Sequence, residues 1–569
     1  MKTLLIKPFG YSFFLMLFLV GFSANAQDLE KITEEKPLKI SGNLGAYFTY
    51  FNASGRPANR VPFSWALRGN PTLSIYGIDI PFSFTLSEQQ RDFRQPFNQF
   101  GLSPKYKWIT VHLGHRNIKW SDYSLAGHNA FGSAIELTPK NFRIGVMYGR
   151  FLKPIEGNSD IDGTFQTPSY KRTGTSFKLG YGTKANNVDL ILFTARDREF
   201  SINPNNAPPQ LTPSENAVIS IKTHHLFFKK LLVDAEFARS IFTANTLTKQ
   251  AEVLDGPLDK IFTSLVDEKV GTTVGSALKA GIEFKEKNYT VRLKYKRVSP
   301  NFASQGAYFF LTDLEKVTLE PVVKLLKNKL IVGGSFGLQR DNLDKLKNTR
   351  TNRIIYSSTI NYTPIQQYNL NASYVNYGIT QKPGTQPIDN QLEIAQVNAQ
   401  VTVNQIVNLL NKSKSQRHSI LLLWNYQDLS DDNASTAQFS EFKSHILTPR
   451  YTFSHLPWKL SASAGYVYTI FKFTDRRTIN QGPSATLSKR FKKPNLSVSA
   501  TFNYYLIESL AFGQTDHSNA FIVALQSKYR LGKKHLFSAR IHLNNGNVAG
   551  INPLNYSETK IDFGYVYTL

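Results

Sequence analysis

The stretch LSASAGYVYTI, residues 460–470, places a larger apolar side chain at every second position. Residues 496–504, LSVSATFNY, and residues 537–544, FSARIHLN, repeat this alternation of apolar and polar positions. Successive side chains of a β-strand point to opposite faces, so a period of two predicts strands with one apolar face. Each run is about ten residues long, which is the length of a tilted strand that crosses a bilayer.

The alternation extends along most of the chain. One apolar face comprises Leu278, Ala280, Ile282 and Phe284, and the next comprises Tyr289, Val291, Leu293 and Tyr295. Short joints at 139–141, 492–495 and 532–534 contrast with long polar stretches at 156–173, 203–216, 378–390 and 428–438. Short turns on one rim and long loops on the other are typical of outer-membrane barrels. The sequence therefore predicts an all-β fold, a single antiparallel transmembrane β-barrel of about 20–26 strands.

A soluble β-sandwich or propeller would also alternate. However, many strands here are long for soluble sheets, in which about 5–6 residues are usual, and Tyr and Phe recur near strand ends. Both features favour the barrel. Residues 257–269 have apolar side chains at helical spacing and predict a helical insert, whereas residues 313–326 fit either a strand or a helix.

The N-terminus has the pattern of a secretory signal. Lys2 and Lys7 precede an uncharged apolar run at residues 11–22, and the small residues Ala24 and Ala26 follow it. The run is shorter than the about 20 residues that a membrane-spanning helix needs. We therefore expect a signal peptide at 1–26, a short N-terminal segment at 27–38 and the barrel at 39–569, in the outer membrane of a Gram-negative bacterium.

Composition and charge narrow the function classes. The chain has no Cys, which excludes thiol nucleophiles and sulfur-ligand metal sites. Its formal net charge is +26, and basic chains often bind nucleic acid. Here the basic residues are spread through strands and turns, and export argues against nucleic acid as a partner. A basic lumen, or turns that face anionic lipid head groups or lipopolysaccharide, accounts for the charge instead.

The parity of the strands predicts which basic side chains point into the lumen. If the apolar faces at 278–284 and 289–295 contact lipid, the alternate residues point inward. By this rule the lumen-facing basic residues are Lys279, Lys285, Arg292, Lys294, Lys296, Lys528, Arg530, Arg540 and His542. Rings of Lys and Arg favour the passage of anions. The alternative is a lumen that is cross-linked by Arg–Glu pairs and closed.

No motif in the sequence predicts catalysis, a metal or a cofactor. His112 and His115, like the adjacent His224 and His225, lack the spacing of two residues that would place both on one strand face. No nucleophile–base arrangement stands out, so we expect the protein not to be an enzyme. Strand-like alternation begins at Leu44, which leaves too little preceding chain for the plug domain of an energised transporter.

The last nine residues, IDFGYVYTL, resemble the C-terminal signal of outer-membrane barrels. In that signal Phe563, Tyr565, Tyr567 and Leu569 form the apolar face, although the usual final residue is Phe. The resemblance implies that the barrel-assembly machinery recognises the last strand. Residues 95–108, 123–128 and 340–364 resemble blocks found in large porin-like outer-membrane barrels without an assigned activity. That resemblance implies a barrel over nearly the whole chain and no particular activity.

Two functions fit these observations. The first is a porin-like channel for small or anionic solutes, which predicts an open basic lumen. The second is a barrel subunit of an outer-membrane assembly, secretion or uptake complex, which predicts a filled lumen and other envelope proteins as partners.

Overall fold

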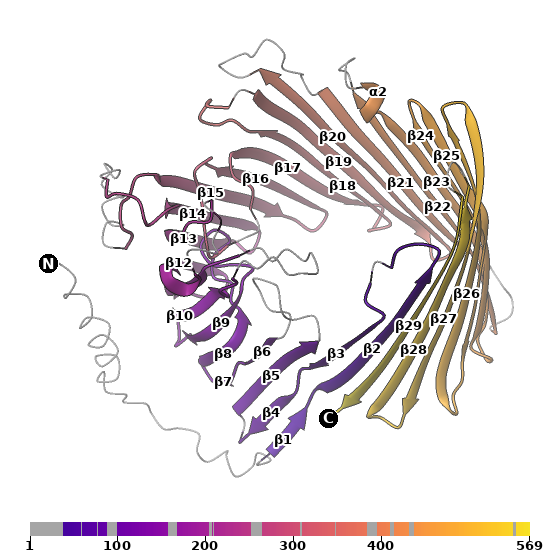
Figure 1. Ribbon diagram of the computed structural model, residues 1–569, viewed down its shortest axis with the longest axis horizontal. Helices are drawn as coiled ribbons and strands as arrows, with labels where there is room; N and C mark the ends of the chain where they lie inside the picture. Colours follow the sequence, from indigo (N-terminus) through magenta and orange to yellow (C-terminus); the bar gives the residue numbers. More distant parts are fainter. Residues whose placement is uncertain are drawn as a thin grey trace.

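The computed structural model describes residues 38–569 except 59, 77, 88–98, 157–167, 204–207, 209, 252–264, 308–309, 348, 384–394, 410–414, 432–436 and 550–552. The described chain is almost entirely β-structure (Figure 1). Its first strand segments are β1 (Leu38–Ser41), β2 (Asn43–Ser54), β3 (Phe63–Gly69), β4 (Thr72–Ile75), β5 (Ile78–Ser87), β6 (Gln99–Leu102), β7 (Lys105–Tyr106), β8 (Ile109–Asn117), β9 (Asn129–Leu137), β10 (Phe142–Leu152), β11 (Lys171–Gly182), β12 (Asn186–Arg198), β13 (Glu215–Phe227) and β14 (Leu231–Thr243).

The second half of the chain continues the same sheet. Its segments are β15 (Thr272–Lys285), β16 (Tyr289–Val298), β17 (Leu314–Leu325), β18 (Leu330–Arg340), β19 (Thr349–Ile365), β20 (Tyr368–Pro383), β21 (Ala395–Leu409), β22 (Gln416–Asp431), β23 (Phe442–His455), β24 (Leu460–Phe473), β25 (Arg476–Arg490), β26 (Asn495–Ala511), β27 (Gln514–Leu531), β28 (His535–Val548) and β29 (Leu554–Thr568). Two single turns of helix, η2 (Glu199–Ser201) and α2 (Ala437–Ser440), accompany the strands in the part of the chain that the structure describes.

The sheet closes on itself. Apart from the interrupted strands named below, each segment pairs antiparallel with its neighbours in sequence, and β29 pairs with β2 from Asn43 opposite Thr568 to Ser54 opposite Ser557. Three pairs of segments, β1 with β2, β3 with β4 and β6 with β7, are successive parts of one strand. The described segments therefore form a closed barrel of 26 strands, which confirms the predicted fold at the upper end of its range.

The two faces of the barrel wall differ as the alternation predicts. Large apolar side chains such as Ile221, Phe237 and Ile282 are exposed on the outer face. Their neighbours in sequence, such as Ser220 and Glu236, lie on the other face and are fully buried. An apolar exterior around a closed hydrogen-bonded wall satisfies every requirement for a strand in lipid. The chain is a large β-barrel of the outer-membrane type.

Two connections fold into the barrel instead of extending from its rim (Figure 1). We call residues 118–128, between β8 and β9, the first inner loop, and the described residues between β16 and β17, 299–307 and 310–313, the second inner loop. Ala126 of the first loop forms a parallel bridge with Ala307 of the second. The inner loops pack on one sector of the wall, so the lumen is lined unequally.

The structure can also be compared with the predictions made for individual segments. Residues 313–326, which fit either a strand or a helix, lie mostly in strand β17. The helical insert predicted at 257–269 lies largely outside the described residues, and Leu265 to Lys269 form a turn, a bend and a bridge. The predicted signal peptide also lies outside them. No helix in the described part of the chain is long and apolar enough to cross a membrane.

Candidate functional site in the barrel lumen

The first inner loop anchors an apolar cluster inside the barrel. Trp120, Tyr123 and Leu125 are almost fully buried, and they belong to one cluster with Phe193 of β12 and Phe302 of the second loop. The rings of Tyr123 and Phe302 meet edge to face with their centroids 5.7 Å apart. Aromatic pairs at this separation add stabilisation beyond their buried area. The loops are therefore packed like a domain core.

A buried carboxylate on the wall fixes the tip of the first loop. Glu236 of β14 is fully buried and accepts hydrogen bonds from the hydroxyl of Ser121 and from the backbone N–H of Tyr123. The ammonium of Lys279 lies 3.2 Å from the same carboxylate and also pairs with Asp122. A buried charge needs such partners, because an unpaired one is very costly.

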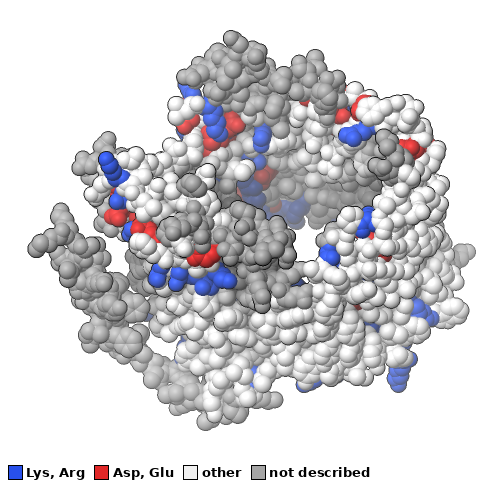
Figure 2. Space-filling view, in the orientation of Figure 1, with Lys and Arg blue, Asp and Glu red and all other residues white. Residues whose placement is uncertain are grey.

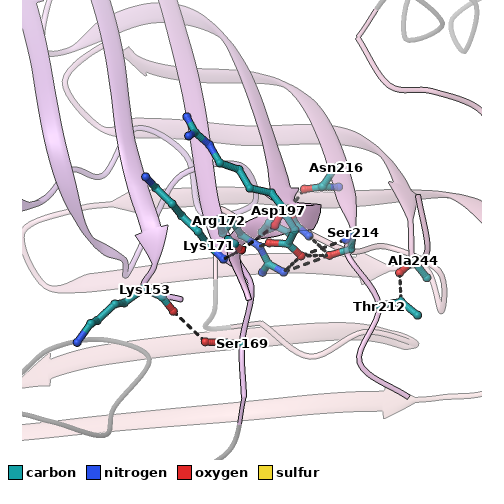
Figure 3. A network of polar contacts seen from close by, with 12 residues as sticks. Lys153, Ser169, Lys171, Arg172, Asp197, Thr212, Ser214, Asn216 and Ala244 are labelled. Carbon is teal, nitrogen blue, oxygen red and sulfur yellow. Dashed lines mark hydrogen bonds and ion pairs between the residues drawn. The ribbon is translucent and has the colours of Figure 1, made fainter. Parts of the chain in front are cut away.

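A second buried network holds the second inner loop (Figure 3). Arg172 of β11 donates two hydrogen bonds of 2.8 Å to the carboxylate of Asp197 on β12. That carboxylate also accepts hydrogen bonds from the backbone and the hydroxyl of Ser214. The side chain of Gln305 donates to the Ser214 hydroxyl over 2.7 Å, and the backbone N–H of Gln305 donates to Asn216 over 2.9 Å. Strand and loop thus share one set of hydrogen bonds.

Two ionisable groups of the first inner loop are shifted by this environment. Burial would raise the pKa of Asp122, but hydrogen bonds and charge from Lys119 and Lys279 outweigh it and lower the pKa to about 2. Burial lowers the pKa of His128 to about 3, and the nearby positive charge of Arg172 adds to the effect. Asp122 is therefore an anion and His128 a neutral imidazole at neutral pH.

The predicted lumen residues of β15 and β16 are mostly ion-paired. Lys279 pairs with Glu236 and Asp122. Arg292 pairs with Glu283 of β15 and with Glu320 of β17, and Lys294 also pairs with Glu320. Lys296 lies directly opposite Lys279 in the register of β15 and β16. In the described residues Lys285, at the end of β15, forms no ion pair.

The predicted residues of β27 and β28 lie in a different environment. Lys528 and Arg540 line a cavity of about 630 Å³ together with Arg68 of β3, Thr49 of β2 and Asp562 of β29. We call this cavity the seam pocket, because it lies where β29 meets β2. Arg530 lies nearer the turn after β27, opposite Leu536, and His542 lies opposite Lys560. Figure 2 shows the barrel hollowed beside the inner loops, with basic and acidic side chains on its inner wall.

A second cavity continues the seam pocket along the wall. It has a volume of about 620 Å³ and shares Gln526 and Lys528 with the seam pocket. Five serines line it, namely Ser454, Ser461, Ser488, Ser497 and Ser499. We call it the serine pocket. No Asp or Glu is among the residues that line it.

The C-terminal residues lie in the closing strand β29. The hydroxyl of Tyr565 lies 2.8 Å from Nδ1 of His535, and the ring of Tyr567 also contacts His535. Phe563 packs near Phe48 across the seam, and the backbone N–H of Leu569 donates to the carbonyl of Gly42. Their recognition by the barrel-assembly machinery stays a prediction.

Among the described residues no group of His, Asp and Glu could hold a metal ion. His112 instead contacts Ser103 over 2.9 Å and Glu136 over 3.5 Å. Sequence reasoning missed Glu236, Asp197 and Asp122. The signal at Glu236 and Asp197 was an acidic residue at an inward position of its strand.

No protein-family model matches the chain, and no curated protein matches it in sequence. Several solved structures resemble its fold weakly. The chain is 11% identical to OccAB2 of Acinetobacter baumannii, with 70% of this chain and 98% of that chain covered and a TM-score of 0.30. It is 10% identical to the FrpB iron transporter of Neisseria meningitidis (F5-1 variant), with 93% of this chain and 82% of that chain covered and a TM-score of 0.38. It is 11% identical to the P pilus usher (PapC) translocation pore, with 94% of this chain and 100% of that chain covered and a TM-score of 0.38. The fold of this chain is therefore assigned from its own strand pairings and not from these resemblances.

Proposed function

We propose that this protein is an outer-membrane channel for small, hydrophilic, anionic solutes. The observation that carries the proposal is the unequal lumen. The inner loops fill one sector of a closed barrel that is hollowed beside them (Figure 2). The seam pocket on the wall bears Arg68, Lys528 and Arg540, which form no ion pair among the described residues. Unpaired cations along a polar wall lower the free energy of an anion in the pore. We propose that Lys279, Arg292 and Lys294 contribute less, because each of them is already ion-paired with a carboxylate.

Export and membrane insertion form part of the same proposal. The apolar outer face supports contact with membrane lipid, and the N-terminal signal pattern supports export. The closing pairing of β29 with β2 supports a role for the C-terminal strand in assembly of the barrel.

Single-channel recording in planar bilayers tests the channel. We expect steps of conductance and, in a KCl gradient, a reversal potential that favours Cl⁻. Replacement of Lys528 and Arg540 by Gln should move the reversal potential toward zero, whereas the same change at Arg476, an exposed residue at the start of β25, should not. A barrel that prefers cations would contradict the proposal.

The packed inner loops favour a second candidate function, a subunit of an envelope complex. A lumen sector filled by a core of Trp120, Tyr123 and Phe302 restricts free diffusion on that side. Gentle detergent extraction of the tagged protein, followed by native sizing and mass spectrometry, separates the two functions. A lone barrel or a homo-oligomer supports the channel, and a stoichiometric complex with other envelope proteins supports the subunit.

A further inference from the structure

We propose that the seam pocket and the serine pocket together form a binding site for an anionic saccharide, a sugar that carries a phosphate or carboxylate group. This inference rests on the proposed channel function and names the solute class that the channel binds. In this site the seam pocket binds the anionic group of the ligand, and the serine pocket binds the sugar hydroxyls.

Charge in the seam pocket is unbalanced. The single carboxylate in its lining, Asp562, accepts a hydrogen bond of 2.8 Å from Thr49 and pairs with Lys560 over 3.0 Å. The remaining lining cations are Arg68, Lys528 and Arg540, and in the described part of the chain none of them forms an ion pair. Two guanidinium groups and an ammonium group around one cavity match the oxygen atoms of a phosphate or carboxylate.

The strand register joins the cationic pocket to the serines. Ser488 lies opposite Ser499, Ser499 opposite Gln526, and Gln526 opposite Arg540. These three steps between neighbouring strands cover about 14 Å, since paired strands lie about 4.8 Å apart. A ligand of one or two sugar units spans this distance.

The lining of the serine pocket suits hydroxylated anionic ligands, because it combines five serines and Gln526 with the cations Lys459, Lys489 and Arg490. Serine and glutamine side chains both donate and accept hydrogen bonds, so they pair with sugar hydroxyls in either direction. A carboxylate would repel the anionic end of the ligand, and neither the serines nor Gln526 carry one. The volume of each cavity, about 630 Å³ and about 620 Å³, falls in the range of small-molecule sites, about 300–1,000 Å³.

Isothermal titration of the purified full-length barrel in detergent tests the site. The probes are glucose 6-phosphate, glucuronate, glucose and inorganic phosphate. We expect saturable binding of at least one of the two anionic sugars, and about tenfold weaker binding of glucose and of phosphate, because each lacks one half of the recognised chemistry. The stronger of the two anionic sugars identifies phosphate or carboxylate as the anion.

Substitutions in the seam pocket and in the serine pocket test the two parts of the site separately. Arg540→Gln and Lys528→Gln should each weaken binding of the anionic sugar about tenfold, whereas Arg476→Gln, with the same change of net charge, should leave it unchanged. Ser488→Ala with Ser499→Ala should weaken the sugar probes but not inorganic phosphate. Migration of unboiled samples in SDS gels verifies that each variant barrel is folded.

The outcomes separate this inference from the channel proposal. If the barrel conducts but no anionic sugar binds saturably, or if Arg540→Gln binds it like the native protein, the saccharide site is wrong and the channel stands. If binding is lost in Arg540→Gln but the native barrel does not conduct, the site stands and the channel is wrong.

Discussion

A single bidentate pair, Arg172 with Asp197, connects the wall to the second inner loop through Ser214. The Asp197 side chain is only 3% exposed, so its charge depends on these partners for stability. Removing one member of a buried ion pair leaves the other without compensation, which costs more than the pair contributes. Residues of this kind decide whether the inner loops stay in place.

Replacement of Asp197 by Ala should therefore destabilise the barrel by about 3–5 kcal/mol. The free energy of unfolding in urea, measured in detergent micelles, provides the test. Asp475→Ala is the control, since Asp475 is exposed and its nearest cation, Arg476, lies 4.0 Å away. Equal stability of the two variants would show that the Arg172–Asp197 pair does not hold the loop.

His128 adds a pH dependence to the same region. Burial, with Arg172 nearby, lowers its pKa to about 3, below the value of about 6.5 expected in the unfolded chain. The unfolded state therefore binds the proton first, and stability should be lost as the pH falls from about 6.5 toward about 3. We expect a loss of about 1–2 kcal/mol between pH 7 and pH 5 from this group.

Urea unfolding of the native protein and of His128→Gln at both pH values measures this effect. The variant should lose less stability on acidification than the native protein, and His517→Gln, an exposed control, should behave like the native protein. Identical pH profiles for all three proteins would exclude His128 as the titrating group.

The backbones of the two inner loops pack in close contact at Gly306 and Ser124. A Cβ atom on Gly306 would lie 2.1 Å from the carbonyl oxygen of Ser124 and 2.7 Å from the ring of Phe193. No side chain fits there unless the loops separate. Gly334 on β18 offers a contrast, because the nearest atom to its Cβ position is 3.6 Å away.

Gly306→Ala should therefore detach the second inner loop from the first. Because the chain has no Cys, Ser124→Cys provides a unique label at a position that is fully buried. The rate of reaction with a charged thiol reagent should rise at least about tenfold in Gly306→Ala, since exposure of the thiol governs its reaction. Gly334→Ala in the same background should leave the rate unchanged, and an unchanged rate in both would refute the loop contact.

At the scale of the whole molecule, one pairing converts a long curved sheet into a barrel. Ala46 of β2 lies opposite Tyr565 of β29, on the apolar face of both strands. Directly opposed residues of an antiparallel pair place their Cα atoms about 4.5–5.5 Å apart, within the range of about 4.4–6.8 Å that a disulfide spans. Without this seam, β2 and β29 would each leave an unpaired edge in the membrane.

A double variant, Ala46→Cys with Tyr565→Cys, should form an intramolecular disulfide on mild oxidation. The crosslink can be read as altered migration of the boiled protein in a non-reducing SDS gel. Ala46→Cys with Leu525→Cys is the control, because Leu525 lies on β27, two strands from β29. Crosslinking in both variants or in neither would contradict closure between β2 and β29.

The sequence predicted the parts of this structure that depend on neighbours in the chain. Alternation at 278–284 follows from the geometry of a single strand, so the apolar face and the fold class could be inferred. The partners of Lys279 could not, because Asp122 is 157 residues away and reaches Lys279 only through the inward fold of the first loop. The same holds for the partner of Asp562, which lies directly opposite Arg540 in the register of β28 and β29 but pairs with Lys560 of its own strand.

The two inner loops also give the barrel unequal mechanics. Where they pack on β12 to β15 the wall is a double layer, and from β19 to β29 the described residues form a single ribbon of strands. Bending stiffness rises steeply with thickness, so thermal deformation of the ring concentrates in the single layer, as for a hoop reinforced along one arc. The aperture therefore changes by flexing of the wall that carries the seam, and amide hydrogen exchange should be fastest there.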